Sequence, residues 1–493
     1  MTKSSISLAK PTTPHGSGRT TTTRTFRSTT TAACAIPTSH NPPHPIGSSR
    51  GRDAVQLLPT YLADARQTVR YHPGTAPHGA LPLGVAESQL MEDWLVPALN
   101  DPVQLSADSI YYQPTAGRED CRRAVASYVE DLTGWDAGRL QLEGLVIGAG
   151  CNAVLENLSF CLAERGDAVL IPTPYYAAFA FDLGARAGLH VQPISNPHVA
   201  NPLNCLLSSK TNTCLDPSVY YPTVESLEAA RHAAIQAGHK PRILLLSHPH
   251  NPLGICYPPH VIKECIDWCR LHEIHLVSDE IYAGSVYDDK SGFVSALKLA
   301  DDSSQGGLGP YIHWVYALSK DFALSGLRVG VVYTENQDIW LPLQKLNDLC
   351  QISSQTQAWT QQRLSAPSPF SDERQFASWV QAFRHENGQR LQARSQALVA
   401  CLEECGIPYL QPTAGLFCWL DLSEYLPQNV SSAADQERHL YLELVEKHGL
   451  LFTPGWSMKH ERPGFFRCVF TAANDEEFAL SLQRIRKFAA SKK

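Results

Sequence analysis

The sequence predicts an α/β fold in which a mostly parallel sheet lies between helices, with a second, smaller α+β domain. From about residue 116 to 350, short apolar runs end in polar clusters and are followed by helical periodicity. This alternation of strands and helices is typical of a parallel sheet covered on both faces. After residue 351 the sequence changes to long charged helices and a few strands. Because 493 residues exceed the usual size of one domain, we expect two domains around one site.

The composition divides the chain into segments. Residues 1–52 are rich in Ser, Thr and Pro and contain no acidic residue before Asp53, so they cannot bury enough apolar surface to fold. The same composition overlaps with that of transit peptides, so mitochondrial import is the alternative to a disordered tail on a cytoplasmic protein. We expect residues 53–115 to pack with the small domain, 116–350 to form the large domain, and 351–493 to form the small domain.

Five apolar runs of the large domain are expected to be strands. They are Gly144 to Ile147, Ala168 to Ile171, Ile243 to Leu246, Ile274 to Val277 and Trp314 to Tyr316. Residues 196–222 interrupt the alternation with Asn, Pro, Ser and Cys, which is typical of a surface insertion. Ser303 to Pro310 is expected to be a loop.

Composition also argues against several classes of protein. No run of about 18 apolar residues predicts a membrane span. The net charge of -7 gives no basic field for a phosphate backbone, so nucleic acid is not an expected partner. The 14 cysteines have no framework spacing and are expected to be reduced. The pairs His248 with His250 and His272 with His275 lack a convincing third ligand, so no metal is expected.

Polar residues follow three successive predicted strands. Asn251 follows the first, Asp279 and Tyr282 follow the second, and Lys320 follows the third. Ligands of open α/β sheets bind beyond the carboxyl ends of the strands, so these side chains should meet. A lysine can form a Schiff base with an aldehyde, and a carboxylate can keep a pyridine nitrogen protonated. Asn251 and Tyr282 would hydrogen-bond the ring 3′-oxygen, so the set suits a pyridine-ring aldehyde cofactor.

Six motifs occur in order within residues 81–485. They are Leu83 to Leu90, Pro172 to Tyr176, Ser278 to Tyr282, Ser319 to Asp321, Ser353 to Gln357 and Ala414 to Trp419. By these motifs the chain resembles the class I/II aminotransferases, pyridoxal 5′-phosphate enzymes of fold type I, and most closely their 1-aminocyclopropane-1-carboxylate (ACC) synthase-like branch. The resemblance implies pyridoxal 5′-phosphate as cofactor, Lys320 as catalytic lysine, an amino acid as substrate and a homodimer.

The resemblance assigns further residues to the cofactor. Tyr176 would stack on its ring. Backbone N–H groups of Cys151 and Asn152, at the start of a helix, would hold its phosphate. Ser319 and Arg328 would also meet the phosphate.

On the substrate side, the resemblance assigns Arg467 to the α-carboxylate, which it would bind as a bidentate fork. Glu87 would help to set the substrate pose. Thr115, contributed by the partner subunit, stands where the family has a tyrosine, and Ala317 stands where the family has a serine that binds phosphate. A threonine offers no aromatic face to a sulfonium cation.

These departures predict an aminotransferase or a carbon-sulfur lyase, as among fungal relatives that serve secondary metabolism. The alternative is ACC synthesis from S-adenosylmethionine, with Tyr111 or Tyr112 replacing the missing ring. A non-catalytic protein that binds the cofactor would carry a DNA-binding domain in front, for which residues 1–52 are too short and too polar. A dehydrogenase is not expected, because no Gly-x-Gly-x-x-Gly follows a strand.

Overall fold

The computed structural model describes residues 47–59, 61–195, 213–301, 307–370, 376–430 and 432–492. Ser49–Lys493 forms one compact unit. Residues 1–46 of the predicted tail lie outside the described residues. The last four residues of the predicted tail, 49–52, belong to helix α1, which spans Ser49–Gln56. This helix has no buried side chain. Among the described residues, no helix is long and apolar enough to cross a membrane.

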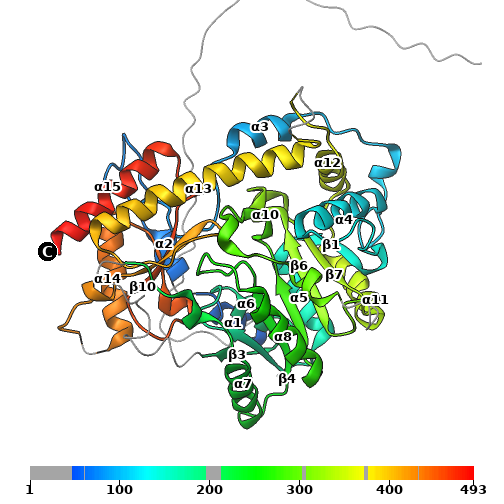
Figure 1. Cartoon of the computed structure of the whole chain (residues 1–493), viewed down its shortest axis with the longest axis horizontal. Coiled ribbons are helices and arrows are strands. Elements are labelled where there is room, and N and C mark those ends of the chain that lie inside the picture. The colour runs from blue at the N-terminus through cyan, green and yellow to red at the C-terminus, as the bar shows by residue number, and fades with distance from the viewer. Residues whose placement is uncertain are drawn as a thin grey trace, which may run out of the picture. The chain divides into compact units, whose positions relative to one another are not determined.

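The main sheet has seven strands in the order β1-β7-β6-β5-β4-β2-β3 (Figure 1). Their bounds are β1 Leu145–Ala149, β2 Ala168–Pro172, β3 His190–Ile194, β4 Pro241–Ser247, β5 His275–Asp279, β6 Ile312–Ala317 and β7 Val329–Thr334. All are parallel except β7, which is antiparallel to β1 and β6. The prediction of a mostly parallel sheet is therefore confirmed, although β3 and β7 were not predicted.

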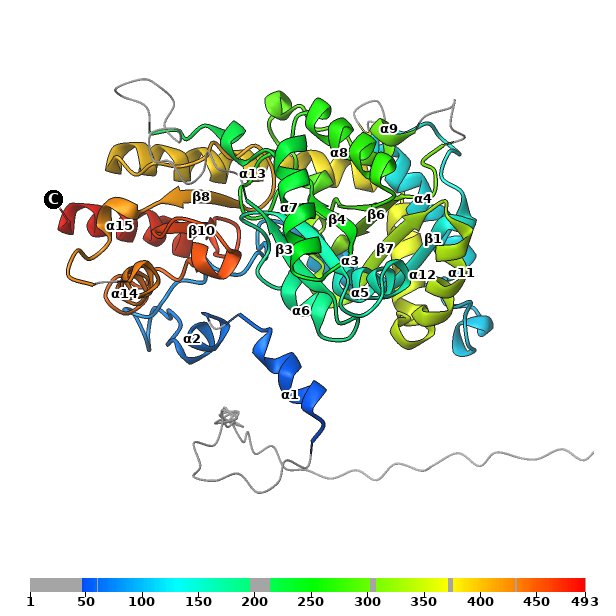
Figure 2. The ribbon, with the colours of Figure 1, turned by 90° about the horizontal axis from the view of Figure 1, so that it is seen from below.

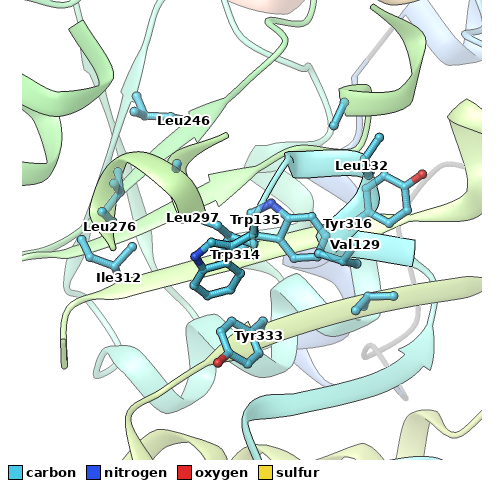
Figure 3. Close-up of a cluster of buried hydrophobic side chains, with 14 of the residues drawn as sticks. Val129, Leu132, Trp135, Leu246, Leu276, Leu297, Ile312, Trp314, Tyr316 and Tyr333 are labelled. Carbon is cyan, nitrogen blue, oxygen red and sulfur yellow. The ribbon is translucent and has the colours of Figure 1, made fainter. Parts of the chain in front are cut away.

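Both faces of this sheet are apolar and covered by helices (Figure 2). Along β4, Leu244 and Leu246 belong to one buried cluster, whereas Ile243 and Leu245 belong to the other, as the alternation of side chains along a strand requires. Figure 3 shows aromatic side chains of the first cluster, in which the rings of Trp314 and Tyr316 stack with centroids 5.5 Å apart. The covering helices of the first face are α4 Glu119–Thr133, α7 Val224–Gln236, α8 Pro259–His272 and α9 Ala296–Ala300; those of the second are α5 Cys151–Leu162, α6 Phe179–Gly184 and α11 Gln337–Leu346.

A second, antiparallel sheet has the order β8-β10-β9. Its strands are β8 Phe417–Asp421, β9 Thr453–Pro454 and β10 Phe465–Val469, and α14 Ala433–Glu446 and α15 Asp475–Ser491 pack with it. Helix α12 Ser354–Leu364 instead packs against α4, and its Trp359 is buried in the core of the main sheet; α13 spans Trp379–Cys405. The long helix α13 runs past both sheets (Figures 1 and 2). Phe383, near its start, is buried in the core of the main sheet, and Leu398, near its end, is buried in the core of the small sheet.

The segment before α4 contains α2 Tyr61–Gln67 and α3 Glu92–Asn100. Residues 81–89 pack against the small sheet, where the N–H of Val469 donates to Leu83 O at 2.8 Å. The domain boundaries at 115/116 and 350/351 stay a prediction.

The predicted surface insertion is corrected in part. Residues 196–212 lie outside the described residues, but Leu215 and Tyr220 are buried, and the N–H of Leu215 donates to Tyr409 O at 2.7 Å. The few apolar side chains of residues 213–222 therefore join the core of the small sheet. Residues 302–306 of the predicted loop also lie outside the described residues.

Candidate active site

One pocket lies at the carboxyl ends of the parallel strands, where open α/β sheets bind their ligands. Strands β4, β5 and β6 lead directly to it, and β10 of the small sheet reaches it from the other side. Ten sequence-predicted residues line this pocket, namely Cys151, Asn152, Tyr176, Asn251, Asp279, Tyr282, Ser319, Lys320, Arg328 and Arg467.

Lys320 stands in the pocket because the short helix α10 (Leu318–Asp321) begins immediately after β6. Its Nζ donates to the carbonyl oxygen of Ala86. Burial, and then the positive charge of Arg467, lower the pKa of Lys320 to about 8. Within the described residues Lys320 forms no ion pair, so its amine is available to a ligand.

Asp279 is the last residue of β5 and is 5% exposed. Its Oδ1 accepts from the N–H of Ile281 at 3.2 Å and from Cys151 Sγ at 3.8 Å. Burial raises the pKa of Asp279 to about 7, because no cation of the described residues pairs with it. A cationic ring nitrogen beside this carboxyl would restore its usual ionised form.

The start of helix α5 gives this pocket an end that suits an anion. Helix α5 begins at Cys151 after Gly150, whose φ of +90° favours glycine, and the described residues provide no side-chain cap for its first N–H groups. Ser319 Oγ is buried and has no partner among the described residues. The guanidinium of Arg328 lies so close to Gly150 that a side chain there would collide with it.

The side chain of Asn152 has a different partner from the one that a phosphate would offer. Its Nδ2 lies 2.9 Å from both carboxyl oxygens of Asp182 in α6. Burial raises the pKa of Asp182 to about 6. The Asn152 side chain is therefore engaged by Asp182, and the role of its backbone N–H at a phosphate stays a prediction.

Arg467, in β10, is 2% exposed. Its Nη1 donates to Asn251 Oδ1 at 2.8 Å, and its Nη2 donates to Gly84 O at 2.7 Å and to Thr453 Oγ1 at 3.3 Å. Its Nε is buried without a partner, and no carboxylate of the described residues pairs with Arg467. Leaving such a cation unpaired is costly, and the geometry suits a ligand carboxylate.

Two of the tyrosines that line the pocket, Tyr176 and Tyr282, were predicted from the sequence. Tyr176 makes an edge-on contact with Phe179, with ring centroids 5.3 Å apart. Tyr282 makes the same kind of contact with Phe417, also at 5.3 Å. Burial raises the pKa of both phenols above their usual value, so both stay protonated donors at neutral pH.

Two predicted substrate residues do not line this pocket. Glu87 is exposed, and its Oε1 accepts from Ser325 Oγ, a lining residue, at 3.2 Å. The carbonyl oxygen of Thr115 accepts from Asn347 Nδ2 at 2.6 Å, away from the pocket of its own chain. Because Thr115 is expected to act in the partner subunit, its role stays a prediction.

Sequence reasoning missed lining residues, of which Tyr61 and Ser247 are the clearest. Tyr61 is 8% exposed and lies close enough to Arg467 for the charge to act on its phenol. It begins helix α2 in a segment without strong periodicity, so no local signal marks it. Ser247 ends β4 and could have been found by the same strand-end rule that found Asp279.

The residues present fit a phosphorylated pyridine aldehyde, the cofactor that the sequence predicts. The buried hydroxyl of Ser319 and the uncapped start of α5 provide donors for a phosphate. Asp279 provides a carboxylate without a cation, and Lys320 provides an amine with a lowered pKa. Arg467 is a buried cation that no carboxylate of the described residues pairs with.

The family model of aminotransferase class I and II matches residues 85–485. An ACC synthase of Nicotiana tabacum is 33% identical over 435 residues, which cover 86% of this chain and 82% of that protein. ACC synthase 11 of Arabidopsis thaliana is 31% identical over 457 residues, or 90% of each chain. A single mutant of Thermus thermophilus aspartate aminotransferase superimposes with a TM-score of 0.65 at 19% identity, covering 90% of this chain and 99% of that one, which concerns the fold alone.

Proposed function

Because this chain belongs to the aminotransferase class I and II family, in its ACC synthase-like branch, it is a pyridoxal 5′-phosphate enzyme, and we propose that it acts on a free α-amino acid by transamination or by carbon-sulfur bond cleavage. The observation that carries this proposal is Arg467, a buried guanidinium without a carboxylate partner among the described residues, in the same pocket as Lys320. A carboxylate bound to Arg467 would bring the adjacent Cα within reach of the Lys320 amine.

The cofactor supplies an aldehyde for the amino group and an electron-withdrawing ring that takes up electrons from the bond broken at Cα. Lys320 would anchor it and later hold the proton removed from Cα. The lowered pKa of Lys320 supports this role, because an amine titrating near the working pH both accepts and returns a proton readily. Asp279 would keep the ring nitrogen protonated, and Asn251 and Tyr282 would donate to the ring oxygen.

The anion end of the pocket would hold the phosphate. The first N–H groups of α5, at Cys151 and Asn152, lie at the N-terminus of the helix, which carries a partial positive charge and suits an anion. The hydroxyl of Ser319 and the guanidinium of Arg328 would add two side-chain donors. Tyr176 would lie against the ring.

ACC synthesis from S-adenosylmethionine is the second candidate, since the curated relatives are named for it. Glu87 favours it, because this acid sits in the motif that sets the substrate pose in the family. Thr115 opposes it, because threonine has no aromatic face where the family has a tyrosine. Ala317 also opposes it, because alanine lacks the hydroxyl of the family's serine. Displacement of sulfur at Cγ demands accurate alignment, and a misplacement of about 1 Å can cost on the order of a hundredfold in rate.

Product analysis separates these reactions. Purified protein loaded with pyridoxal 5′-phosphate is incubated with a panel of amino acids, cysteine S-conjugates and S-adenosylmethionine, and the products are identified by mass spectrometry. A new amino acid from an added keto acid indicates transamination, and pyruvate with a thiol indicates carbon-sulfur cleavage. Efficient ACC formation that is lost in Tyr112→Ala would favour the second candidate. The Lys320→Ala variant is the control and should form none of these products.

No turnover with any amino acid, from a protein that still binds the cofactor, would contradict the proposal and favour a non-catalytic protein. Lys298 offers a matched control for the lysine substitution, because it lies on the partly exposed helix α9 and not in the pocket. Lys298→Ala should keep the full activity.

A further inference from the structure

We propose that the Cys151 side chain is a positioning residue for Asp279, to which its thiol donates a hydrogen bond that favours the ionised carboxylate. This inference rests on the proposed function, in which Asp279 keeps the ring nitrogen of the cofactor protonated. It gives the Cys151 thiol a role that is separate from that of its backbone N–H at the phosphate.

The contact is specific to one carboxyl oxygen. Cys151 Sγ and the N–H of Ile281 both donate to Oδ1 of Asp279, at 3.8 Å and 3.2 Å. Among the described residues Oδ2 has no hydrogen-bond donor. The two donors therefore fix the carboxyl group by one oxygen and leave the other to a ligand in the pocket.

The neighbouring acids Asp182 and Glu280 do not stabilise the ionised carboxylate of Asp279. Asp182, on α6, is held by the amide of Asn152, and Glu280, the next residue after Asp279, accepts from Ser278 Oγ and from the N–H of Ala296. Both acids oppose ionisation of Asp279 by their negative charge. A donor beside Asp279 offsets part of this repulsion.

The thiol stays a donor at neutral pH. Burial, followed by the negative charges of Asp279 and Asp182, raises the pKa of Cys151 well above its ordinary value, although Lys320 acts in the opposite direction. A thiolate here would repel the carboxylate, and the protonated thiol attracts it. Cys151 is therefore suited to hydrogen bonding and not to nucleophilic attack.

Loss of the thiol should move the proton that Asp279 and the ring nitrogen share. With the donor present, the ionised carboxylate beside a protonated nitrogen is favoured. Without it, the proton moves toward Asp279, and the ring withdraws electrons less well. A thiol is a weak donor, so we expect about a threefold to tenfold loss in kcat in Cys151→Ala. The backbone N–H of residue 151 remains, so cofactor affinity should change less than about threefold.

The test reads the ring nitrogen directly. Wild type, Cys151→Ala and Cys151→Ser are loaded with nitrogen-15-labelled pyridoxal 5′-phosphate, and the nitrogen chemical shift is followed against pH with cofactor affinity and kcat. We expect the shift to move toward the unprotonated value in Cys151→Ala and to return in Cys151→Ser, because a hydroxyl restores the donor. Cys161→Ala, on the same helix but outside the pocket, is the matched control and should match the wild type.

Asp279→Asn distinguishes a failure of the Cys151 proposal from a failure of the proposed role of Asp279. If the ring nitrogen loses its proton in Asp279→Asn but its chemical shift is unchanged in Cys151→Ala, the proposal for Cys151 is wrong and the proposed role of Asp279 stands. If Asp279→Asn leaves the nitrogen protonated, the role of Asp279 itself is wrong. A shift that changes equally in Cys161→Ala would also overturn the proposal, because the effect would then be a general one of packing in α5.

Discussion

The lowered pKa of Lys320 makes its reaction with the cofactor dependent on pH. Burial and the charge of Arg467 lower its pKa to about 8, and only the neutral amine attacks an aldehyde. We expect the rate of cofactor capture by the cofactor-free protein to rise about tenfold per pH unit below pH 8 and to level off above it. Stopped-flow absorbance between pH 6 and 9 measures this rate. A rate that still rises about tenfold per pH unit at pH 9 would contradict the lowered pKa of Lys320.

Asp279 should destabilise the cofactor-free protein. Burial raises the pKa of Asp279 from 3.8 to about 7 in the folded state, so stability is lost as the pH rises through this window. Asp279→Asn removes the charge, and we expect the cofactor-free variant to be more stable than the wild type at pH 8 by roughly 2–4 kcal/mol. The difference should shrink toward pH 4.

Urea denaturation of the cofactor-free proteins at pH 5 and pH 8 measures this difference. The loaded variant should lose at least about a hundredfold in kcat, because the ring no longer has a charged partner. Equal stability of variant and wild type at both pH values would show that Asp279 is solvated in the absence of the cofactor.

Several site residues could be predicted because each follows a buried strand. Asp279 and Lys320 stand where β5 and β6 end, and local apolar runs mark these positions. Tyr61 could not be predicted, since it approaches Arg467 from a segment about 400 residues away in sequence, and only the fold brings them together. The pairing of Asn152 with Asp182 likewise depends on the packing of α5 on α6.

At the scale of elements, Asp321 joins the helix that carries Lys320 to the turn after Tyr282. Its Oδ2 accepts from the N–H of Gly284 at 2.6 Å and from the hydroxyl of Tyr316 at 2.9 Å. That hydroxyl also lies 2.8 Å from the hydroxyl of Tyr128. The buried network therefore fixes α10, β6, α4 and the short helix η5 (Ala283–Ser285) against one another.

Removal of one hydroxyl tests this network. Tyr316→Phe leaves Asp321 with one donor fewer and leaves the phenol of Tyr128 without its partner, which should cost about 1–3 kcal/mol of unfolding free energy. Tyr333→Phe is a matched control, because the hydroxyl of Tyr333 makes longer, partly buried contacts of 3.3 Å. Urea denaturation compares the two, and an equal loss would contradict a special role of the network.

The elements that sequence reasoning missed have identifiable physical reasons. Strand β3 contains His190, Gln192 and Pro193 and is only partly buried at the edge of the sheet, so it lacks an apolar run. Strand β7 is apolar, but only the eleven residues 318–328 separate its first residue, Val329, from the end of β6 at Ala317. That distance is too short for a parallel crossover, and the strand pairs antiparallel. Pairing partners are decided by such connections and not by local pattern.

At the scale of the whole molecule, exposed apolar side chains in two segments favour the predicted homodimer. Ile110 is 80% exposed, Leu349 is 75% exposed, and Tyr111 and Tyr112 are exposed beside Ile110. Asn347, two residues before Leu349, donates to Thr115 O, so the two segments are neighbours. Such patches mark interaction surfaces, and isologous dimers are the commonest assembly.

We expect the double variant Tyr112→Asp with Leu349→Asp to sediment as a monomer and to lose most activity, because the partner segment near Thr115 is missing from its site. Leu271→Asp, at a residue that is 77% exposed on α8, should leave the assembly unchanged. Sedimentation velocity at the assay concentration measures both. A fully active wild-type monomer would contradict the composite site.

Helix α13 also has a mechanical consequence. This helix has 27 residues, and its two ends are buried in different cores. A rotation of the small sheet relative to the main sheet would therefore bend the helix. Gly388 lies between Phe383 and Leu398, and a Cβ added there would meet no atom of the described residues within 4 Å. Glycine in a helix interior is less stable than alanine by roughly 0.5–1 kcal/mol, so we expect the helix to bend most easily at this position. Gly388→Ala should therefore increase the free energy of unfolding by about that amount, as measured by urea denaturation. It should also make the helix between the small sheet, which contains Arg467, and the main sheet, after which Lys320 lies, more rigid.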